Sequence, residues 1–153
     1  MNSSSEKSVQ LEELMPLIRE ALSSGGSVRL SPRGTSMLPM LRQGVDQVVL
    51  SPVNGRLQRF DLPLYQRENG QYVLHRIVAA GETYICVGDN QFDLEHGIRQ
   101  DQLIAVVTSF FRAEKEISVT SFGYRCYCRF WHYSRPIRLL WRKVMFRLRR
   151  LLR

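Results

Sequence analysis

The chain has 153 residues, 44% of them hydrophobic, and its 22 Lys and Arg outnumber its 14 Asp and Glu to give a net charge of +8. This length suits one domain of about 100–200 residues with a single hydrophobic core. The first thirty residues contain four glutamates and no apolar run near the ~20 residues that a membrane span needs, nor do they show the pattern of a secretory signal. We therefore expect a cytoplasmic protein without a leading membrane anchor.

The net charge comes from the C-terminal end of the chain. Residues 1–123 carry 12 basic and 14 acidic side chains, whereas residues 124–153 carry 10 basic and no acidic ones. Cys86, Cys126 and Cys128 form an odd set, which without an export signal indicates reduced thiols in the cytoplasm. Cys126, Cys128 and His132 lack a fourth ligand and the usual spacing of a zinc site, so the sequence predicts neither a metal nor a cofactor.

The N-terminal part is predicted to contain a disordered segment followed by a helix. Residues 1–8 are polar and Ser-rich, which favours disorder. Apolar residues then recur at helical spacing, at Leu11, Leu14, Met15, Ile18 and Leu22. Gly25-Gly26 should end this helix, and Pro16 should start its regular part or kink it. We expect the helix to pack on a sheet.

Short β-branched or aromatic runs between turn residues predict strands over the next part of the chain. The expected strands are 28–30, 47–50, 62–66, 71–79, 83–87 and 103–111. Asn69-Gly70 predicts a tight hairpin between 62–66 and the strand that follows it. This regular strand spacing predicts a mainly β protein with a coiled, barrel-like domain.

Three blocks of the sequence contain the residue types that serine hydrolysis needs. Ser36 lies in the block 34–40 after the first strand, His75 lies in the strand 71–79, and the third block, 88–90, follows the strand 83–87. A serine hydroxyl is a poor nucleophile until a base takes its proton, and imidazole has a pKa suited to that task. Ser36 and His75 are therefore the candidate nucleophile and general base. The carboxylates that can orient the imidazole are Asp89, Asp93 and Glu95.

Gly-Thr-Ser-Met-Leu-Pro at 34–39, His-Arg-Ile at 75–77 and Gly-Asp-Asn at 88–90 together resemble the signal peptidase superfamily of serine peptidases. The branch that they resemble carries histidine as the base where the bacterial enzymes of general secretion carry lysine. The resemblance covers roughly residues 28–107 and implies a signal-peptidase/LexA-like β domain. It implies that Ser36 is the nucleophile and His75 the base, with Glu95 at the spacing of the triad aspartate. Asp89 matches the aspartate of the Gly-Asp-Asn turn.

The resemblance also implies which residues surround the reaction centre. The backbone N–H of Ser36 and the Thr35 hydroxyl are the expected oxyanion donors, because Gly34 stands where many members of the family have a hydroxyl residue. The expected substrate-binding residues are Met37, Leu38 and Pro39, although Met37 and Leu38 can equally be ordinary core residues.

Beyond Ser121 the sequence becomes basic and aromatic, and Pro136 opens a predicted helix to the C-terminus. The apolar stripe of this helix comprises Ile137, Leu140, Trp141, Val144, Met145, Leu148, Leu151 and Leu152. Basic residues take most of the other face, a pattern typical of a helix that lies in the headgroup region of an anionic membrane. The expected membrane-binding residues are Trp141, Arg142, Phe146 and Arg149. Docking on the protein's own β domain, nucleic-acid binding, and binding of a partner protein or acidic peptide remain open as alternatives.

The sequence thus predicts a disordered N-terminus (1–8), a peptidase domain with an N-terminal helix (9–120), and a basic aromatic amphipathic tail (121–153). We expect a serine endopeptidase that cleaves a leader or precursor peptide on the cytoplasmic side, held at the inner membrane face by its tail. The alternative is a peptidase-like fold without catalysis that binds a membrane surface or a peptide. A self-cleaving repressor is disfavoured, because the single N-terminal helix is too short for a DNA-binding domain.

Overall fold

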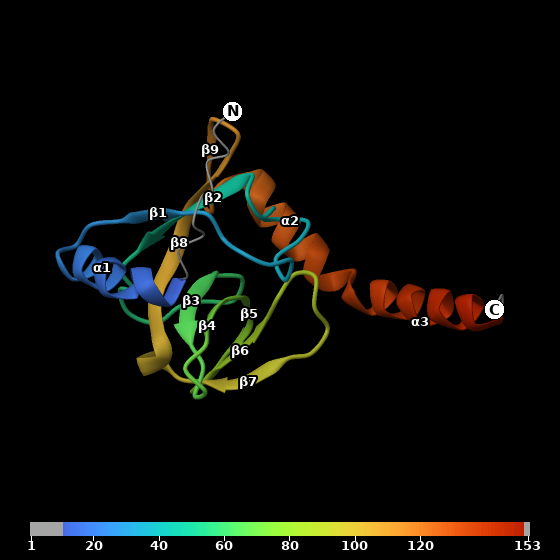
Figure 1. Ribbon diagram of the computed structural model, residues 1–153. Helices are drawn as coiled ribbons and strands as arrows, with labels where there is room; N and C mark the ends of the chain where they lie inside the picture. The colour runs from blue at the N-terminus through green and yellow to red at the C-terminus, as the bar shows by residue number, and fades with distance from the viewer. Residues whose placement is uncertain (1–10, 152–153) are drawn as a thin grey trace, which may run out of the picture.

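The computed structural model describes residues 11–151, which form three α-helices and nine strands in two antiparallel sheets (Figure 1). The helices are α1 (Leu11–Ser23), α2 (Phe122–Tyr133) and α3 (Arg135–Leu151), and a 3-10 turn spans Gln100–Gln102. The strands are β1 (Val28–Leu30), β2 (Asp46–Ser51), β3 (Pro63–Gln66), β4 (Tyr72–Leu74), β5 (Arg76–Ala80), β6 (Tyr84–Val87), β7 (Glu95–Ile98), β8 (Leu103–Arg112) and β9 (Lys115–Ser118). Helices and strands hold similar numbers of residues, so the expected mainly β class is only partly right. The segment predicted to be disordered, 1–8, lies outside the described residues.

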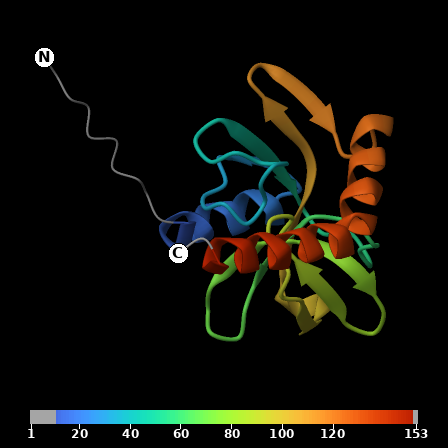
Figure 2. The ribbon, with the colours of Figure 1, turned by 90° about the vertical axis from the view of Figure 1, so that its right-hand side faces the viewer.

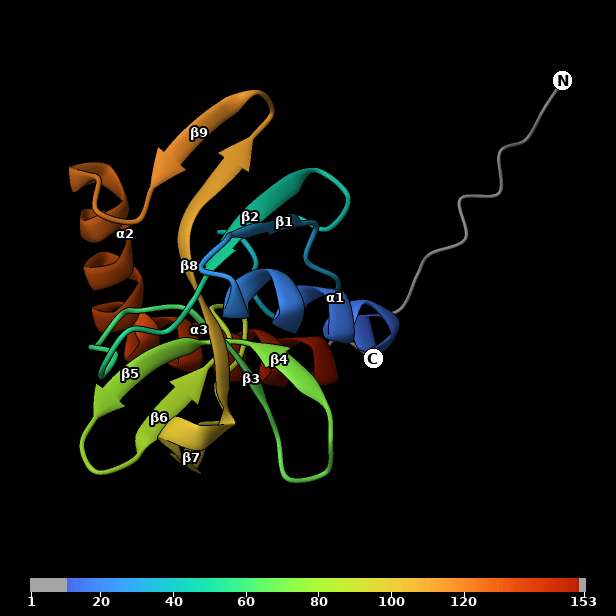
Figure 3. The ribbon, with the colours of Figure 1, turned by 90° about the vertical axis from the view of Figure 1, so that its left-hand side faces the viewer.

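The larger sheet has the strand order β1-β2-β8-β3-β4, and β9 also pairs with β8. The ten residues of β8 contact β2, β3 and β9, so this strand connects the whole sheet (Figure 3). β3 and β4 form the predicted hairpin, in which Leu64 pairs with Leu74. Gly70 in its turn has a φ of 87°, a conformation that glycine adopts without the steric cost that other residues meet.

The smaller sheet consists of β5, β6 and β7. The predicted strand 71–79 is therefore not continuous, because β4 belongs to the larger sheet and β5 to the smaller one. His75 is the residue between them. Local sequence preference does not reveal this break, since strand-forming residues lie on both sides of it. The expected closed, barrel-like arrangement is not found among the described strands, which form two antiparallel sheets that no ladder joins.

Two strands were not predicted from the sequence. β7 reads Glu-His-Gly-Ile, with Gly97 at a positive φ, and β9 reads Lys-Glu-Ile-Ser. Neither has the alternating apolar pattern that identifies a strand, so their pairing with β6 and β8 depends on the tertiary structure.

Two hydrophobic clusters hold these elements together. The larger cluster packs the predicted helix α1 and helix α2 with the larger sheet, and includes Met15, Ile18, Leu22, Val48, Leu50, Phe110, Tyr124 and Cys128. The smaller cluster includes Tyr65 of β3 together with Ile77, Tyr84, Cys86 and Ile98 of the smaller sheet. Because Tyr65 and Ile77 come from different sheets, this second cluster joins the two sheets on either side of His75.

The segment after Ser121 is not a single tail. α2 packs on the body, with Tyr124 and Cys128 buried in the larger cluster, although the prediction placed residues 121–153 together. α3 begins at Arg135, next to the predicted Pro136, and extends away from the body in Figure 1, whereas in the view of Figure 2 it crosses in front of the body. None of the helices between residues 11 and 151 is long and apolar enough to cross a membrane.

Candidate active site

Ser36 lies in the turn between β1 and β2 and is half-buried. Gly34, two residues earlier, has a φ of 82°, where other residues are strained. A glycine here contributes no side-chain hydrogen-bond donor to this turn. The Ser36 N–H donates no hydrogen bond within residues 11–151.

The turn formed by Gly88, Asp89 and Asn90 packs directly on the backbone of Ser36. The Asn90 N–H donates to the Ser36 carbonyl oxygen at 2.8 Å, and the Asn90 side chain donates to the Thr35 carbonyl oxygen at 3.2 Å. A Cβ atom at Gly88 would lie 2.6 Å from the Ser36 carbonyl oxygen, too close for any other residue. The first and third sequence blocks thus form one contact, and Gly88 permits their close approach.

His75 is held rigidly between the two sheets. Its side chain is buried, and its Nδ1 lies 2.8 Å from Glu95 Oε1 on β7. The hydroxyl of Tyr65 lies 3.4 Å from the same nitrogen and comes from β3. Because Nδ1 is occupied by Glu95, Nε2 is the imidazole nitrogen available to a substrate or to a serine hydroxyl.

Glu95 is fixed in turn by Arg67, which follows β3. Arg67 Nε donates to Glu95 Oε2 at 2.8 Å, and Arg67 Nη2 donates to Oε1, so the ion pair is bidentate. Burial acts to raise the pKa of Glu95, but the hydrogen bonds from Arg67 and Tyr65 outweigh it and leave the pKa below its usual value. The group behind His75 is therefore a charged carboxylate.

The pKa of His75 is lowered from its ordinary value of 6.5. Burial is the main cause, because it disfavours the charged imidazolium, while Glu95 opposes it. The imidazole is consequently neutral at neutral pH, which is the form that accepts a proton from a nucleophile.

Ser36 and His75 line the same pocket, whose volume is about 250 Å³. Its lining includes the apolar side chains of Met37, Leu41 and Leu74 and the basic side chains of Arg33 and Arg67. No hydrogen bond joins Ser36 to His75 in the part of the chain that the structure describes, and such contacts are often long before a substrate binds. Of the three expected substrate-binding residues, Met37 lines this pocket, whereas Leu38 and Pro39 are not among its lining residues.

Asp89 makes no hydrogen bond to His75 within the described residues, so the structure does not bring this alternative for the orienting acid to the imidazole. Its two carboxylate oxygens accept hydrogen bonds from Arg76 Nε and Nη2, both at 2.8 Å, inside the body. Tyr127 of α2 also donates to Asp89, at 2.9 Å. Asp93 makes no contact with His75 within the described residues either, and the position beside the imidazole belongs to Glu95.

Arg67 and Tyr65 are site residues that the sequence did not identify. Both come from the β3 hairpin and reach Glu95 or His75, which are distant along the chain. The resemblance concerned the three blocks alone, and an arginine at a hairpin turn is usually a solvated residue. The predicted β3–β4 hairpin ends just before His75, and this is the feature of the sequence that could have placed Tyr65 and Arg67 near the site.

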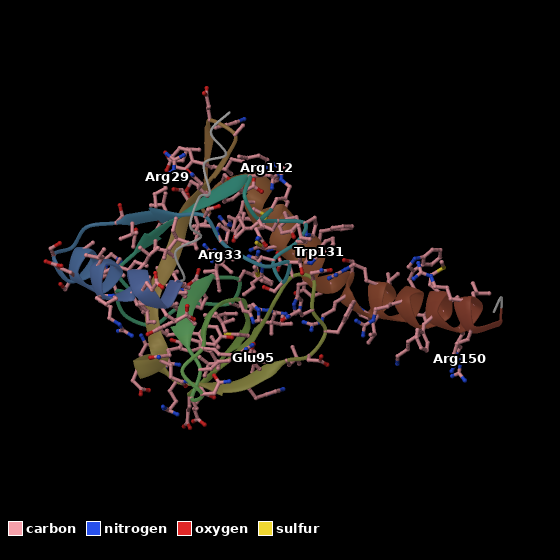
Figure 4. The ribbon with its side chains drawn as sticks, in the orientation of Figure 1. Arg29, Arg33, Glu95, Arg112, Trp131 and Arg150 are labelled. Atoms are coloured by element: carbon pink, nitrogen blue, oxygen red, sulfur yellow. The ribbon has the colours of Figure 1, made fainter. Side chains whose placement is uncertain are left out.

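The expected membrane-binding residues of α3 lie outside this site. Trp141 and Phe146 are exposed, whereas the Arg142 guanidinium stacks on the Phe92 ring at 4.3 Å. Phe146 follows Trp141 by five residues, which puts it about 140° around the helix and off the apolar stripe. Figure 4 shows Trp131 at the body and Arg150 on the distal part of α3.

Comparison of this chain with family models, curated proteins and solved structures finds no match. The resemblance to signal peptidases therefore remains an expectation from three short motifs.

Proposed function

We propose that this protein is a serine peptidase in which Ser36, His75 and Glu95 act together. The observation that carries the proposal is the position of His75, whose Nδ1 lies 2.8 Å from the charged Glu95 while its ring lines the pocket of Ser36. A nucleophile, a neutral imidazole and a carboxylate in this order are the components of Ser-His-acid catalysis.

In this proposal the Ser36 hydroxyl attacks the carbonyl carbon of a peptide bond and transfers its proton to His75 Nε2. The negative charge that develops on the carbonyl oxygen is stabilised by the Ser36 N–H. The imidazolium, stabilised by Glu95, then gives its proton to the leaving amine, which leaves an acyl-Ser36 ester. A water molecule, deprotonated by His75, hydrolyses this ester and restores the hydroxyl.

The proposed substrate is a leader or precursor peptide on the cytoplasmic side. The cytoplasmic setting is supported by the cysteines, because Cys86, Cys126 and Cys128 are all free thiols, as is usual in a reducing compartment. The pocket supports a peptide substrate, since its apolar and basic lining side chains can contact the side chains and backbone of a peptide beside Ser36.

A fluorophosphonate probe tests the serine without knowledge of the substrate. The serine oxygen attacks phosphorus, fluoride leaves, and the histidine takes the hydroxyl proton, so labelling reports the activated pair. We expect a single label on Ser36, which Ser36→Ala abolishes and His75→Ala reduces by at least 100-fold. Ser23→Ala, at the exposed end of α1, is the matched control and should label as the wild type does.

Peptide cleavage is tested by incubating the wild type and Ser36→Ala with precursor peptides of the same cell and reading the cut sites by mass spectrometry. Cuts made by the wild type and absent with Ser36→Ala support a peptidase. Equal cleavage by both proteins contradicts it. A folded wild type that neither reacts with the probe nor cuts any peptide favours the alternative, a peptidase-like protein without catalysis.

A further inference from the structure

α3 combines seven basic residues with an exposed apolar stripe, and neither feature is used by the candidate active site. Between Arg135 and Leu151 the helix contains seven Arg and Lys and no acidic residue. None of the salt bridges among residues 11–151 involves a side chain of α3. The charge of this helix is therefore not neutralised by the protein that it extends from.

The apolar stripe of α3 faces away from the body. Ile137, Leu140 and Trp141 retain 72%, 63% and 68% of their accessible surface, and Val144 and Leu148 are also exposed. At 100° per residue these five side chains lie within about 100° of one another around the helix, with basic residues on both flanks. The stripe does not dock on the β domain, so that interpretation of the tail does not hold for α3.

The first two turns of α3 are fixed to the loop after the Gly88 turn. Arg135 donates to the Phe92 carbonyl oxygen at 2.7 Å, and the Arg138 guanidinium stacks on Trp131 at 3.8 Å. Trp131 in turn donates to the Asp89 carbonyl oxygen at 2.7 Å. The Arg142 guanidinium also lies over the Phe92 ring. The contacts of Arg135, Arg138 and Arg142 together fix the direction of α3 relative to the body.

The remaining cations of α3 are Lys143, Arg147, Arg149 and Arg150, and they make no hydrogen bond or ion pair within the described residues. All four belong to the half of α3 that is distal to the body, where Figure 4 labels Arg150. A cationic flank beside exposed Trp and Leu matches a bilayer surface, where phosphate groups meet acyl chains.

We propose that α3 binds an anionic phospholipid surface, with the stripe from Ile137 to Leu148 at the level of the acyl chains and the flanking cations at the phosphates. A second copy of the chain is a poorer occupant, because it would bring seven more like charges against the first seven. Nucleic acid would pair with the cations and leave the apolar stripe exposed. A lipid surface can bind the cations through its phosphates and cover the apolar stripe with its acyl chains.

The contacts between α3 and the loop of residues 89–92 also determine where a bound bilayer lies relative to the protein. The loop that holds α3, residues 89–92, continues from the turn that packs on Ser36. Because Arg135, Arg138 and Arg142, which contact this loop or Trp131, lie on the other face of α3 from the stripe, a bilayer that holds the stripe lies on the side of α3 that faces away from the loop. This inference does not depend on catalysis by Ser36.

Co-sedimentation of the full chain with vesicles tests the proposal. We expect binding to vesicles of phosphatidylcholine mixed with phosphatidylglycerol, weak binding to phosphatidylcholine alone, and loss of binding as sodium chloride is raised. Arg149→Gln together with Arg150→Gln should weaken binding roughly 30-fold, which corresponds to about 1 kcal/mol for each lost charge. Arg19→Gln together with Lys115→Gln removes the same charge from the body and should bind as the wild type does.

Tryptophan fluorescence tests which face is inserted. Trp141 is exposed and Trp131 is partly buried, so a blue shift on vesicle binding should come from Trp141. Trp141→Phe should still sediment with the vesicles and show no shift. If the α3 double variant (Arg149→Gln with Arg150→Gln) binds vesicles as well as the body double variant (Arg19→Gln with Lys115→Gln), the proposal is overturned. So does binding to RNA but not to vesicles, or a salt-resistant dimer that Trp141→Ser dissociates.

Discussion

His75 Nδ1 lies 2.8 Å from Glu95 Oε1, although the two residues are 20 positions apart and belong to different structural segments. The contact forms because the chain passes from the larger to the smaller sheet at His75, and β7 returns along β6 to bring Glu95 back. Arg67, from the hairpin before His75, completes the arrangement by binding both oxygens of Glu95.

Glu95→Gln should slow labelling of Ser36 and any peptide cleavage by a factor on the order of 10⁴, because the amide neither fixes the tautomer of His75 nor stabilises its cation. The measurement is the rate of fluorophosphonate labelling, with thermal unfolding to verify the fold. Glu82→Gln replaces an exposed glutamate in a turn and should retain the wild-type rate. An unchanged rate in Glu95→Gln would remove Glu95 from the proposed mechanism.

The pH dependence follows from the lowered pKa of His75. Since the neutral imidazole is the proton acceptor in the proposed mechanism, the labelling rate should rise with pH through a midpoint below 6.5 and then level off. The native state binds this proton more weakly than the unfolded chain, so the stability that it contributes is present above pH 6.5 and is lost as pH falls through the folded pKa. NMR titration of the His75 ring protons measures the same midpoint, and a value above 6.5 contradicts the argument.

Gly88→Ala should disturb the site through the backbone. The added Cβ would lie 2.6 Å from the Ser36 carbonyl oxygen, so the turn or Ser36 itself must move. A displacement of about 1 Å can reduce catalysis by about 100-fold, and we expect a decrease of that order in labelling. Gly123→Ala is the matched control, because nothing lies within 4 Å of its Cβ, and it should leave labelling unchanged. Equal rates in the two variants would show that the Gly88 contact does not position Ser36.

Asp89→Asn should destabilise the protein more than it affects the chemistry of His75. Arg76 is buried and donates to Asp89, to the Tyr124 hydroxyl at 2.8 Å and to Cys128 Sγ at 3.0 Å, so it connects β5, the Gly88 turn and α2. Loss of the carboxylate charge leaves a buried cation without its counter-ion, which costs about 3–5 kcal/mol. For a domain of this size the Tm should fall by roughly 10–15 °C.

Thermal unfolding followed by circular dichroism provides this measurement. Asp101→Asn removes the acid of an exposed ion pair with Arg99 and is the control, since such pairs contribute little. A Tm for Asp89→Asn equal to that of the control would contradict a structural role for Asp89.

Much of the fold was accessible from local patterns. The apolar spacing of Leu11 to Leu22 predicted α1, and Asn69-Gly70 predicted the β3–β4 hairpin, because helical periodicity and turn chemistry are properties of neighbouring residues. β7 and β9 were missed, since their charged residues and glycine have no strand pattern of their own and they are ordered by the strands beside them.

The candidate site, like the fold, could be predicted from the sequence only in part. Ser36 and His75 stand in short motifs that the sequence displays, and so does the amphipathic pattern of α3. The residues themselves left three carboxylates open as partners of His75, and only the resemblance put Glu95 at the spacing of the triad acid. The structure brings Glu95 to the imidazole through the pairing of β6 with β7, whereas Asp89 binds Arg76.

The sequence by itself determined the residue types of the site, the hairpin and the charge of the C-terminal helix, because each of these depends on residues close together in the chain. The tertiary structure alone decided that the strand breaks at His75, that Arg67 holds Glu95, and that α2 packs while α3 extends away from the body. Those features depend on contacts between distant segments, and local preference contains no information about which distant segment will supply a partner.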